Sequence, residues 1–259
     1  MLLALNVNNT HTLVGLYEGE KLLVHWRLST DQARTVDEYG VLLRGLFAEW
    51  GQPRPPITGV AVSSVVPPMN DRIEEVCRRF FGHEPLVVGP GVRTGVPILY
   101  DNPKEVGADR ICNAVAAYDR VRGAAIVVDF GTATTFDVVT AKGEYAGGVI
   151  APGIGISLDA LVARTAKLPR VELQWPPRVV GKTTVHAIQA GVTFGYTALV
   201  DGLVDRIRAE QDRDARVIAT GGLGALIAPH SRTIETVDEF LTVDGLRMIW
   251  ARNGGRDAT

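Results

Sequence analysis

The sequence contains little that would mark a secreted, zinc-binding or membrane-spanning protein. Its two cysteines, Cys77 and Cys112, lie far apart and outside any metal-ligand spacing, so we expect reduced thiols in a cytoplasmic compartment. The five histidines are scattered without ligand pairs, which gives no support for zinc. No run of 18 apolar residues occurs, and the apolar opening "MLLALNV" lacks a basic start. We therefore expect a buried strand there and no membrane span.

An excess of charge of one sign is also missing. The formal net charge is −2 at pH 7, which offers no electrostatic reason to expect nucleic acid or an anionic membrane surface as a partner. A hydrophobic content of 46% and a charged content of 22% are ordinary for a globular protein. With 259 residues, the chain is long enough for one large or two medium domains.

One local pattern occurs twice. The stretch "LALNVNNTHTLVGLYEGEKL" begins at Leu3, and "IVVDFGTATTFDVVTAKGEY" begins at Ile126. Each consists of an apolar strand, a polar Asn or Asp, a tight run of small residues and a second strand. Asn6 aligns with Asp129, at an offset of 123 residues that is close to half the chain. This offset favours duplication of a whole domain over a chance likeness between two hairpins.

The agreement continues through each half. Residues 57–76 and 215–228 both predict a strand, a turn and a helix. Residues 36–50 and 187–210 both show apolar side chains at helical spacing. Each half then reads as a hairpin with a third strand, a helix, a strand and a helix. We predict an α/β fold of two duplicated domains, 1–117 and 118–259, with a cleft between them.

The two hairpin turns carry the chemistry expected of a phosphate site. They are rich in Gly, Thr and Asn, whose backbone N–H groups and hydroxyls can cradle phosphate oxygens. Two such turns on opposite walls of a cleft would suit a nucleoside triphosphate, because phosphoryl transfer needs its charge held and its oxygens aligned. The paired glycines of "ATGGLG" at 219–224 either lie against the adenosine or simply begin a helix.

Two other glycine-rich stretches are rejected as nucleotide motifs. In "WPPRVVGKTT", Pro176 stands where a P-loop needs its first glycine, and no strand is predicted before it. In "GPGVRTG", from Gly89 to Gly95, the spacing is wrong for a dinucleotide fingerprint, so we predict a loop that turns the chain.

Several stretches taken together resemble one family. They are "EVGADRI" at 105–111, "VDFGTATT" at 128–135, "GGVIAPGI" at 147–154, "AKLPRV" at 166–171, "VVGKTT" at 179–184 and "VIATGGL" at 217–223. In this order they resemble the type III pantothenate kinases, over Leu2 to about Asn253. That family belongs to the acetate-kinase, sugar-kinase and actin superfamily, which has duplicated ribonuclease-H-like domains. The resemblance implies ATP-dependent phosphorylation of pantothenate to 4′-phosphopantothenate, the first step towards coenzyme A.

The resemblance also implies site residues, cofactors and a homodimer. Asp109 matches the general base; the alternative is a helix-terminal ion pair with Arg110. Asp129 matches the ligand of a monovalent cation, K⁺ or NH₄⁺, and Mg²⁺ accompanies the ATP. The implied substrate-binding positions are Tyr100, Gly107, Ala108, Asp109, Arg110 and Thr184, with Thr184 reaching the substrate of the neighbouring subunit, although Tyr100 could equally be an ordinary half-buried aromatic. The implied nucleotide-binding positions are Asn6, Val7, Asn8, Asn9, Thr10, His11, Thr12, Leu13 and Thr132.

The first turn departs from the family pattern of Asp, any residue, Gly, Asn, Thr. Here it reads "NVNNT", so that Asn6 replaces the carboxylate that helps to organise Mg²⁺. An amide can hold a metal-bound water but lacks the negative charge that attracts a hard cation. Asn8 replaces the glycine, and we expect it to be tolerated because Asn accepts left-handed backbone.

The departure leaves three hypotheses. The protein is either a kinase that binds ATP and Mg²⁺ weakly, or a non-catalytic relative that binds pantothenate or nucleotide and regulates through partners. The third is a kinase of another small alcohol on the same architecture. The intact "GADR" at 107–110 favours a kinase, because a binding protein has no need of a base.

Overall fold

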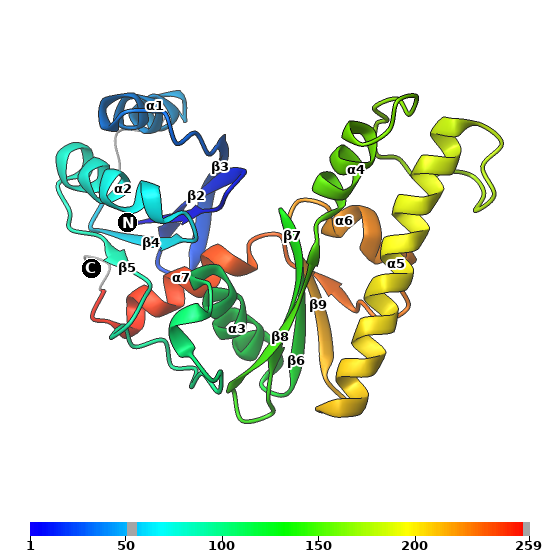
Figure 1. Cartoon of the computed structure of the whole chain (residues 1–259). Helices are drawn as coiled ribbons and strands as arrows, with labels where there is room; N and C mark the ends of the chain where they lie inside the picture. The colour runs from blue at the N-terminus through cyan, green and yellow to red at the C-terminus, as the bar shows by residue number, and fades with distance from the viewer. Residues whose placement is uncertain (51–55, 256–259) are drawn as a thin grey trace. The chain divides into compact units, whose positions relative to one another are not determined.

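A computed structural model of the chain describes residues 1–50 and 56–255 (Figure 1). They form two compact units. The first contains Met1–Pro97, Asp101–Ala116 and the C-terminal segment that begins at Leu241, and the second contains Ile98–Tyr100 and Ala117–Phe240. The division of the repeat at residues 117 and 118 stays a prediction.

The first unit is built on a five-stranded sheet with β1 in the middle. Its strands are β1 (Leu2–Val7), β2 (His11–Glu18), β3 (Lys21–Ser29), β4 (Gly59–Ser64) and β5 (Leu86–Val87), in the order β3-β2-β1-β4-β5. Strand β2 is antiparallel to β1, and β4 is parallel to it. Every residue of β1 is buried, as its continuous apolar sequence requires, because both faces of this part of the sheet are covered.

Helices α1 (Val36–Glu49) and α2 (Asn70–Val76) cover one face of this sheet (Figure 1). A capping box starts α1, since the Thr35 side chain accepts the N–H of Glu38 and the Glu38 carboxylate accepts the N–H of Thr35. The core on this face joins side chains of the sheet with those of both helices: Leu3, Leu5, Val60, Val62, Tyr39, Leu43, Phe47, Ile73 and Val76. The remaining helical turns nearby are η1 (Pro67–Met69), the π-helical η2 (Cys77–Phe81) and η3 (Pro103–Glu105).

The opposite face of the sheet packs against α7 (Leu241–Arg252) and the start of α3 (Ala108–Val121). A Cβ on Gly59 would lie 2.6 Å from the ring of Trp250, so β4 and α7 approach closely there. The Thr242 hydroxyl donates to Asn113 Oδ1 over 2.7 Å and ties α7 to α3. Because side chains alternate along β4, Ser63 faces the same side as Gly59.

The second unit repeats the sheet of the first. Its strands are β6 (Ala125–Phe130), β7 (Ala133–Val139), β8 (Tyr145–Pro152), β9 (Arg216–Thr220) and β10 (Thr236–Val237). Their order, β10-β9-β6-β7-β8, matches that of the first sheet, with β7 antiparallel and β9 parallel to the middle strand β6. The predicted fold class, a duplicated ribonuclease-H-like α/β architecture, is confirmed.

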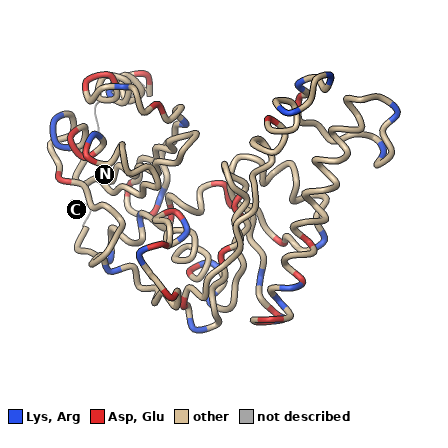
Figure 2. Tube along the Cα trace, in the orientation of Figure 1, with Lys and Arg blue, Asp and Glu red and all other residues tan. Residues whose placement is uncertain are grey.

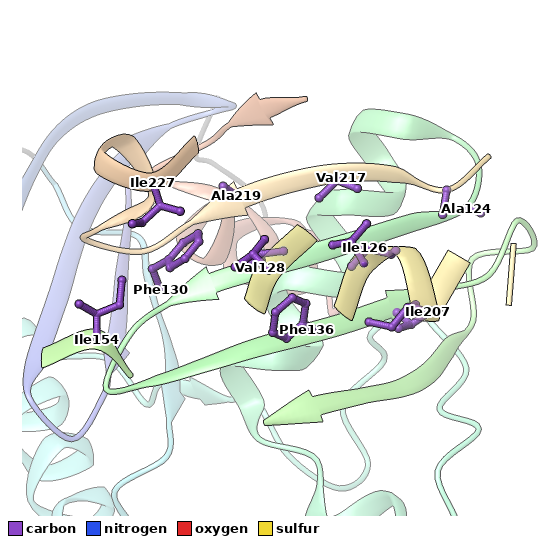
Figure 3. Close-up of a cluster of buried hydrophobic side chains, with 14 of the residues drawn as sticks. Ala124, Ile126, Val128, Phe130, Phe136, Ile154, Ile207, Val217, Ala219 and Ile227 are labelled. Atoms are coloured by element: carbon purple, nitrogen blue, oxygen red, sulfur yellow. The ribbon is translucent and has the colours of Figure 1, made fainter. Parts of the chain in front are cut away.

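One long helix, α5 (Thr184–Glu210), supplies most of the helical part of the second core (Figure 3). It is joined by α4 (Ile154–Ala163), α6 (Gly224–Ile227) and η4 (Ala228–His230). By length and composition α5 could cross a membrane, but its buried side chains belong to the apolar cluster on the sheet. Its fully buried residues include Val200 and Val204, whereas Tyr196, Leu199 and Leu203 on the predicted apolar helix are only half-buried.

Candidate active site

Two polar residues lie side by side near the ends of β1 and β4 in the first unit. Asn6 is the penultimate residue of β1, and it lies in register with Ser63 on the parallel strand β4. Asn6 is 3% exposed and Ser63 is 0% exposed. Within the described part of the chain, Asn6 Oδ1 and Ser63 Oγ have no hydrogen-bond partner. Buried oxygens of this kind are usually paired, so a ligand or water is expected there.

Asp109 lies in the first turn of α3, on the side of the sheet that Ser63 faces. Its Oδ1 accepts the backbone N–H of Arg110 over 2.8 Å. A Cβ at Gly107 would come within 2.6 Å of this oxygen and 3.3 Å of Val65, the residue that follows β4. Glycine at 107 therefore lets the carboxylate fold back over the helix start beside the end of β4.

Desolvation by burial raises the pKa of Asp109 above its ordinary value. The hydrogen bond from the Arg110 N–H and the positive charge of Arg110 lower the pKa, but they do not offset the desolvation. Asp109 is half-buried and Arg110 is 7% exposed, so the alternative of an exposed surface ion pair does not fit. A desolvated carboxylate with a raised pKa is a stronger proton acceptor once it is ionised.

The first hairpin turn contains the residues predicted to hold the nucleotide. Asn6 and Val7 end β1, residues 8–10 form the turn, and residues 11–13 begin β2. The N–H of Asn8 donates to the carbonyl of His11 over 3.1 Å. Asn8 does not need its tolerance of left-handed backbone, because Arg122 alone among the described non-glycine residues has a positive φ. Gly131, at the matching place in the second turn, does not have a positive φ either. Backbone conformation therefore gives no reason for glycine at these two positions.

The second turn places Asp129 against the glycine pair that follows β9. A Cβ on Gly221 would lie 2.5 Å from Asp129 Oδ1 and 2.7 Å from the carbonyl oxygen of Phe130. Gly221 has a φ of +84°, which also favours glycine. Only glycine at position 221 therefore lets this turn approach Asp129 and the Phe130 backbone so closely. Asp129 lies in register with Thr220 on the parallel strand β9, as Asn6 does with Ser63.

Thr132 lies beside the start of α4. Its carbonyl accepts the N–H of Gly153, the N-cap residue of that helix, over 3.1 Å. A Cβ on Gly153 would collide with the carbonyl oxygens of Thr132 and Gly131, so only glycine allows this approach. Thr132 and Gly131 are exposed, which leaves the turn accessible to a ligand.

The other predicted substrate residues, Tyr100 and Thr184, belong to the second unit. Tyr100 is half-buried, and its ring lies 6.3 Å from that of Tyr145 and close to Gly147 of β8. Thr184 is exposed at the first position of α5, where Thr183 caps the helix by accepting the N–H of His186. No strand precedes this turn within the described residues 164–183, in agreement with the rejection of a P-loop.

Sequence reasoning missed Ser63, Thr220 and the steric role of Gly153. The two hydroxyl residues are found only through the strand pairing, which joins segments more than 50 residues apart. Among the described residues, no group of three or more His, Cys, Asp or Glu side chains is placed to hold a metal ion.

The duplicated sheets with a small polar turn after each middle strand define the class of kinases and related ATPases with two ribonuclease-H-like units. A protein from Sinorhizobium meliloti described as a 2-dehydro-3-deoxygalactonokinase shares this fold, with a TM-score of 0.62 and 12% identity over 100% of this chain and 98% of the other.

A family model described as type III pantothenate kinase matches residues 2–206. The type III pantothenate kinase of Myxococcus xanthus is 55% identical over 98% of this chain and 99% of its own length. That of Anaeromyxobacter sp. (strain K) is 57% identical over 98% of this chain and 100% of its own length. The chain belongs to the type III pantothenate kinase family.

The raised pKa of Asp109 predicts that Asp109→Asn stabilises the fold at neutral pH. A carboxyl whose folded pKa exceeds its unfolded pKa costs no stability below the unfolded value. It destabilises increasingly as the pH rises through the folded pKa. Asparagine can keep the hydrogen bond from the Arg110 N–H without ionising. Melting temperatures from pH 4 to pH 8 should show an advantage for the variant at pH 7 that shrinks towards pH 4.

The matched control is Asp101→Asn, which removes an exposed carboxylate from the same unit. It should change the melting temperature little at any pH. A lower melting temperature of Asp109→Asn at pH 7, or an advantage that does not depend on pH, would contradict this account of the site.

Proposed function

We propose that this protein transfers the γ-phosphoryl group of ATP to the primary hydroxyl of pantothenate, giving 4′-phosphopantothenate and ADP in the cytoplasm. The observation that carries the proposal is the desolvated carboxylate of Asp109 at the start of α3, within the "GADR" segment of a family member. A protein that only bound its ligands would gain nothing from holding a carboxylate in a site that disfavours its charge.

Asp109 is the residue proposed to accept the proton. As the hydroxyl oxygen forms its bond to the γ-phosphorus, the bond to the bridging oxygen of ADP breaks and the hydroxyl proton passes to the carboxylate. In a largely dissociative transfer this proton moves late, so a carboxylate is a sufficient base. Its raised pKa makes it a better acceptor, while at low pH protonation removes it from the reaction.

The polar turn of each unit is proposed to bind phosphate oxygens. Mg²⁺ bound to ATP would offset phosphate charge, and the buried Asn6 amide oxygen fits a water of such an ion. In the second turn, the Asp129 carboxylate is the proposed ligand of a monovalent cation, as the family resemblance implies. Neither turn contains a lysine, so bound cations are the expected source of positive charge near the phosphates.

Pantothenate is an anion, and the chain offers positive charge near its expected position. Arg110 follows the proposed base directly, and its fork of N–H groups suits a carboxylate or amide oxygen. The segment between α4 and α5 also carries Arg164, Lys167, Arg170, Arg178 and Lys182 against a single acidic residue, Glu172 (Figure 2). This segment leads directly to Thr184, so its field would draw anionic substrates towards that residue.

We also propose that two copies of the chain form a homodimer through the second unit. Apolar side chains that are 39–77% exposed occur on β8, on α4, before α5 and at its start: Ile150, Ile156, Leu161, Val179, Val180 and Val185. Exposed apolar clusters of this kind commonly mark an interface. Thr184 lies beside Val185, so a partner seated here would place Thr184 near the partner's own ligands.

The function is tested by ADP release with ATP, Mg²⁺ and K⁺, in the presence and absence of pantothenate. The wild-type chain should release ADP only with pantothenate, and the product should carry the phosphoryl group on its primary hydroxyl. Asp109→Asn should lower kcat by about 10²- to 10⁴-fold, as expected for loss of a general base. ADP release that is absent, or that does not need pantothenate, would overturn the proposal.

Restoring a carboxylate at position 6 should strengthen the interaction with the metal–nucleotide. We expect Asn6→Asp to lower the KM for Mg–ATP by about tenfold, which corresponds to about 1.4 kcal/mol of charge-assisted contact. Gln211→Glu adds the same charge at an exposed position in the second unit and serves as control. Steady-state kinetics at varied ATP measures the effect, and equal KM values for wild type and Asn6→Asp would count against the role of the first turn.

The dimer is tested by sedimentation velocity. Wild type should sediment as a dimer, and Val180→Glu should shift the population towards monomer, since it places a charge in the proposed apolar interface. Val41→Glu changes a residue of similar exposure, 66% against 77%, in the first unit and should leave the dimer intact. A monomeric wild type would refute the interface.

A further inference from the structure

Ser63 is a buried residue with a hydroxyl group, and the proposed phosphoryl transfer assigns it no role. It is 0% exposed at the carboxyl end of β4, and its Oγ makes no hydrogen bond to any described residue. The thiol of Cys112 in α3 lies near enough to interact with this hydroxyl, but burial raises the pKa of the thiol, so the thiol stays neutral. A thiol is a weak hydrogen-bond partner. The structure therefore leaves the Ser63 hydroxyl free to meet a ligand.

The strand register gives this hydroxyl a partner. Ser63 pairs with Asn6 on the adjacent parallel strand, about 4.8 Å away between strand axes, and paired residues present their side chains on the same face. Asn6 Oδ1 is likewise buried and without a hydrogen bond in the described chain. Leaving two adjacent oxygens unpaired would cost about 1–3 kcal/mol each, so their common position is informative.

The second unit contains the same pairing. Asp129 at the end of the middle strand β6 lies in register with Thr220 on the parallel strand β9, and Thr220 is 1% exposed. In both units a buried hydroxyl thus accompanies the polar residue that ends the middle strand. The repetition at equivalent places of a duplicated fold argues against a chance buried serine.

We propose that Ser63 is a positioning residue for the metal–nucleotide: its hydroxyl and the Asn6 amide oxygen together receive one water of the hydrated divalent ion. This inference rests on the proposed function, which supplies the nucleotide. A water bound to a cation donates stronger hydrogen bonds than a free water, and two neutral oxygens can accept its two hydrogens. Ser63 thereby supplies the second contact in a turn that lacks the family carboxylate.

The test measures binding rather than turnover. A non-hydrolysable ATP analogue, adenylyl imidodiphosphate, is titrated into the full chain by calorimetry, once with Mg²⁺ and once with EDTA. Ser63→Ala should raise the Kd of the Mg²⁺ complex by about three- to tenfold, as loss of one hydrogen bond predicts. The Kd without Mg²⁺ should change by less than about twofold, and Ser63→Thr should restore Mg²⁺-dependent affinity because it keeps the hydroxyl.

A structural role would give a different pattern. Removing an unpaired buried hydroxyl should leave the melting temperature of the free protein unchanged or higher. The control is Thr242→Val, which removes a buried hydroxyl of the same unit that does have a partner, Asn113. That variant should melt at a lower temperature and keep the wild-type ratio of the two Kd values. If Ser63→Ala fails to fold, Ser63→Cys keeps the volume and removes the strong acceptor.

The outcomes separate this inference from the proposed function. Equal losses of affinity with and without Mg²⁺, or no loss in either, would overturn the role of Ser63. So would a wild-type chain that binds the analogue equally well in Mg²⁺ and in EDTA. Pantothenate is absent from the titration, so a chain that shows the predicted Mg²⁺ effect but phosphorylates no pantothenate would refute the proposed function alone.

Discussion

The structure depends on a single constraint that occurs in both units: the penultimate residue of each middle strand is a polar side chain within an otherwise apolar, buried strand. In the first unit this residue is Asn6 and in the second it is Asp129, each with a hydroxyl residue beside it on the parallel strand. Apolar strands on both sides fix these positions, because a shift of one residue would turn the polar side chain into the opposite face. The core that stabilises each sheet thus also determines where its polar turn lies.

The proposed base, Asp109, is likewise a polar group held in a desolvated position. Asp109 is held at the start of α3, where the N–H of Arg110 and the charge of Arg110 favour its ionised form, yet desolvation is the larger effect on its pKa. Burying a carboxylate costs free energy of folding, so stability alone does not account for this residue. The fold tolerates it because the neighbouring contacts are strong, including the hydrogen bond that joins α7 to α3 and the close approach of Gly59 to Trp250.

Much of the fold could be predicted because the sequence contains an internal repeat. The alignment of Asn6 with Asp129 predicted two sheets of the same kind, and the identical strand orders confirm it. The partners of these residues could not be predicted, because Ser63 and Thr220 reach them only through pairing of strands that are distant in sequence. The burial of Asp109 was hidden for a similar reason: it follows from packing of α3 beside β4, not from local sequence. The backbone angle at position 8 could not be predicted from the family glycine, since Asn8 and Gly131 both lack a positive φ.

The neutral first turn can be understood from the charges that surround it. Asp109 already places one desolvated carboxylate on the helix side of β4, and a second at position 6 would add a like charge to the same part of the unit. In the absence of nucleotide and Mg²⁺, that repulsion would raise the pKa of Asp109 further and destabilise the fold. An amide at position 6, assisted by the Ser63 hydroxyl, avoids this repulsion while keeping two acceptors for a hydrated cation. On the proposed function, an amide at position 6 would keep the free protein more stable at the expense of affinity, and the triphosphate itself would bring the negative charge needed for the metal.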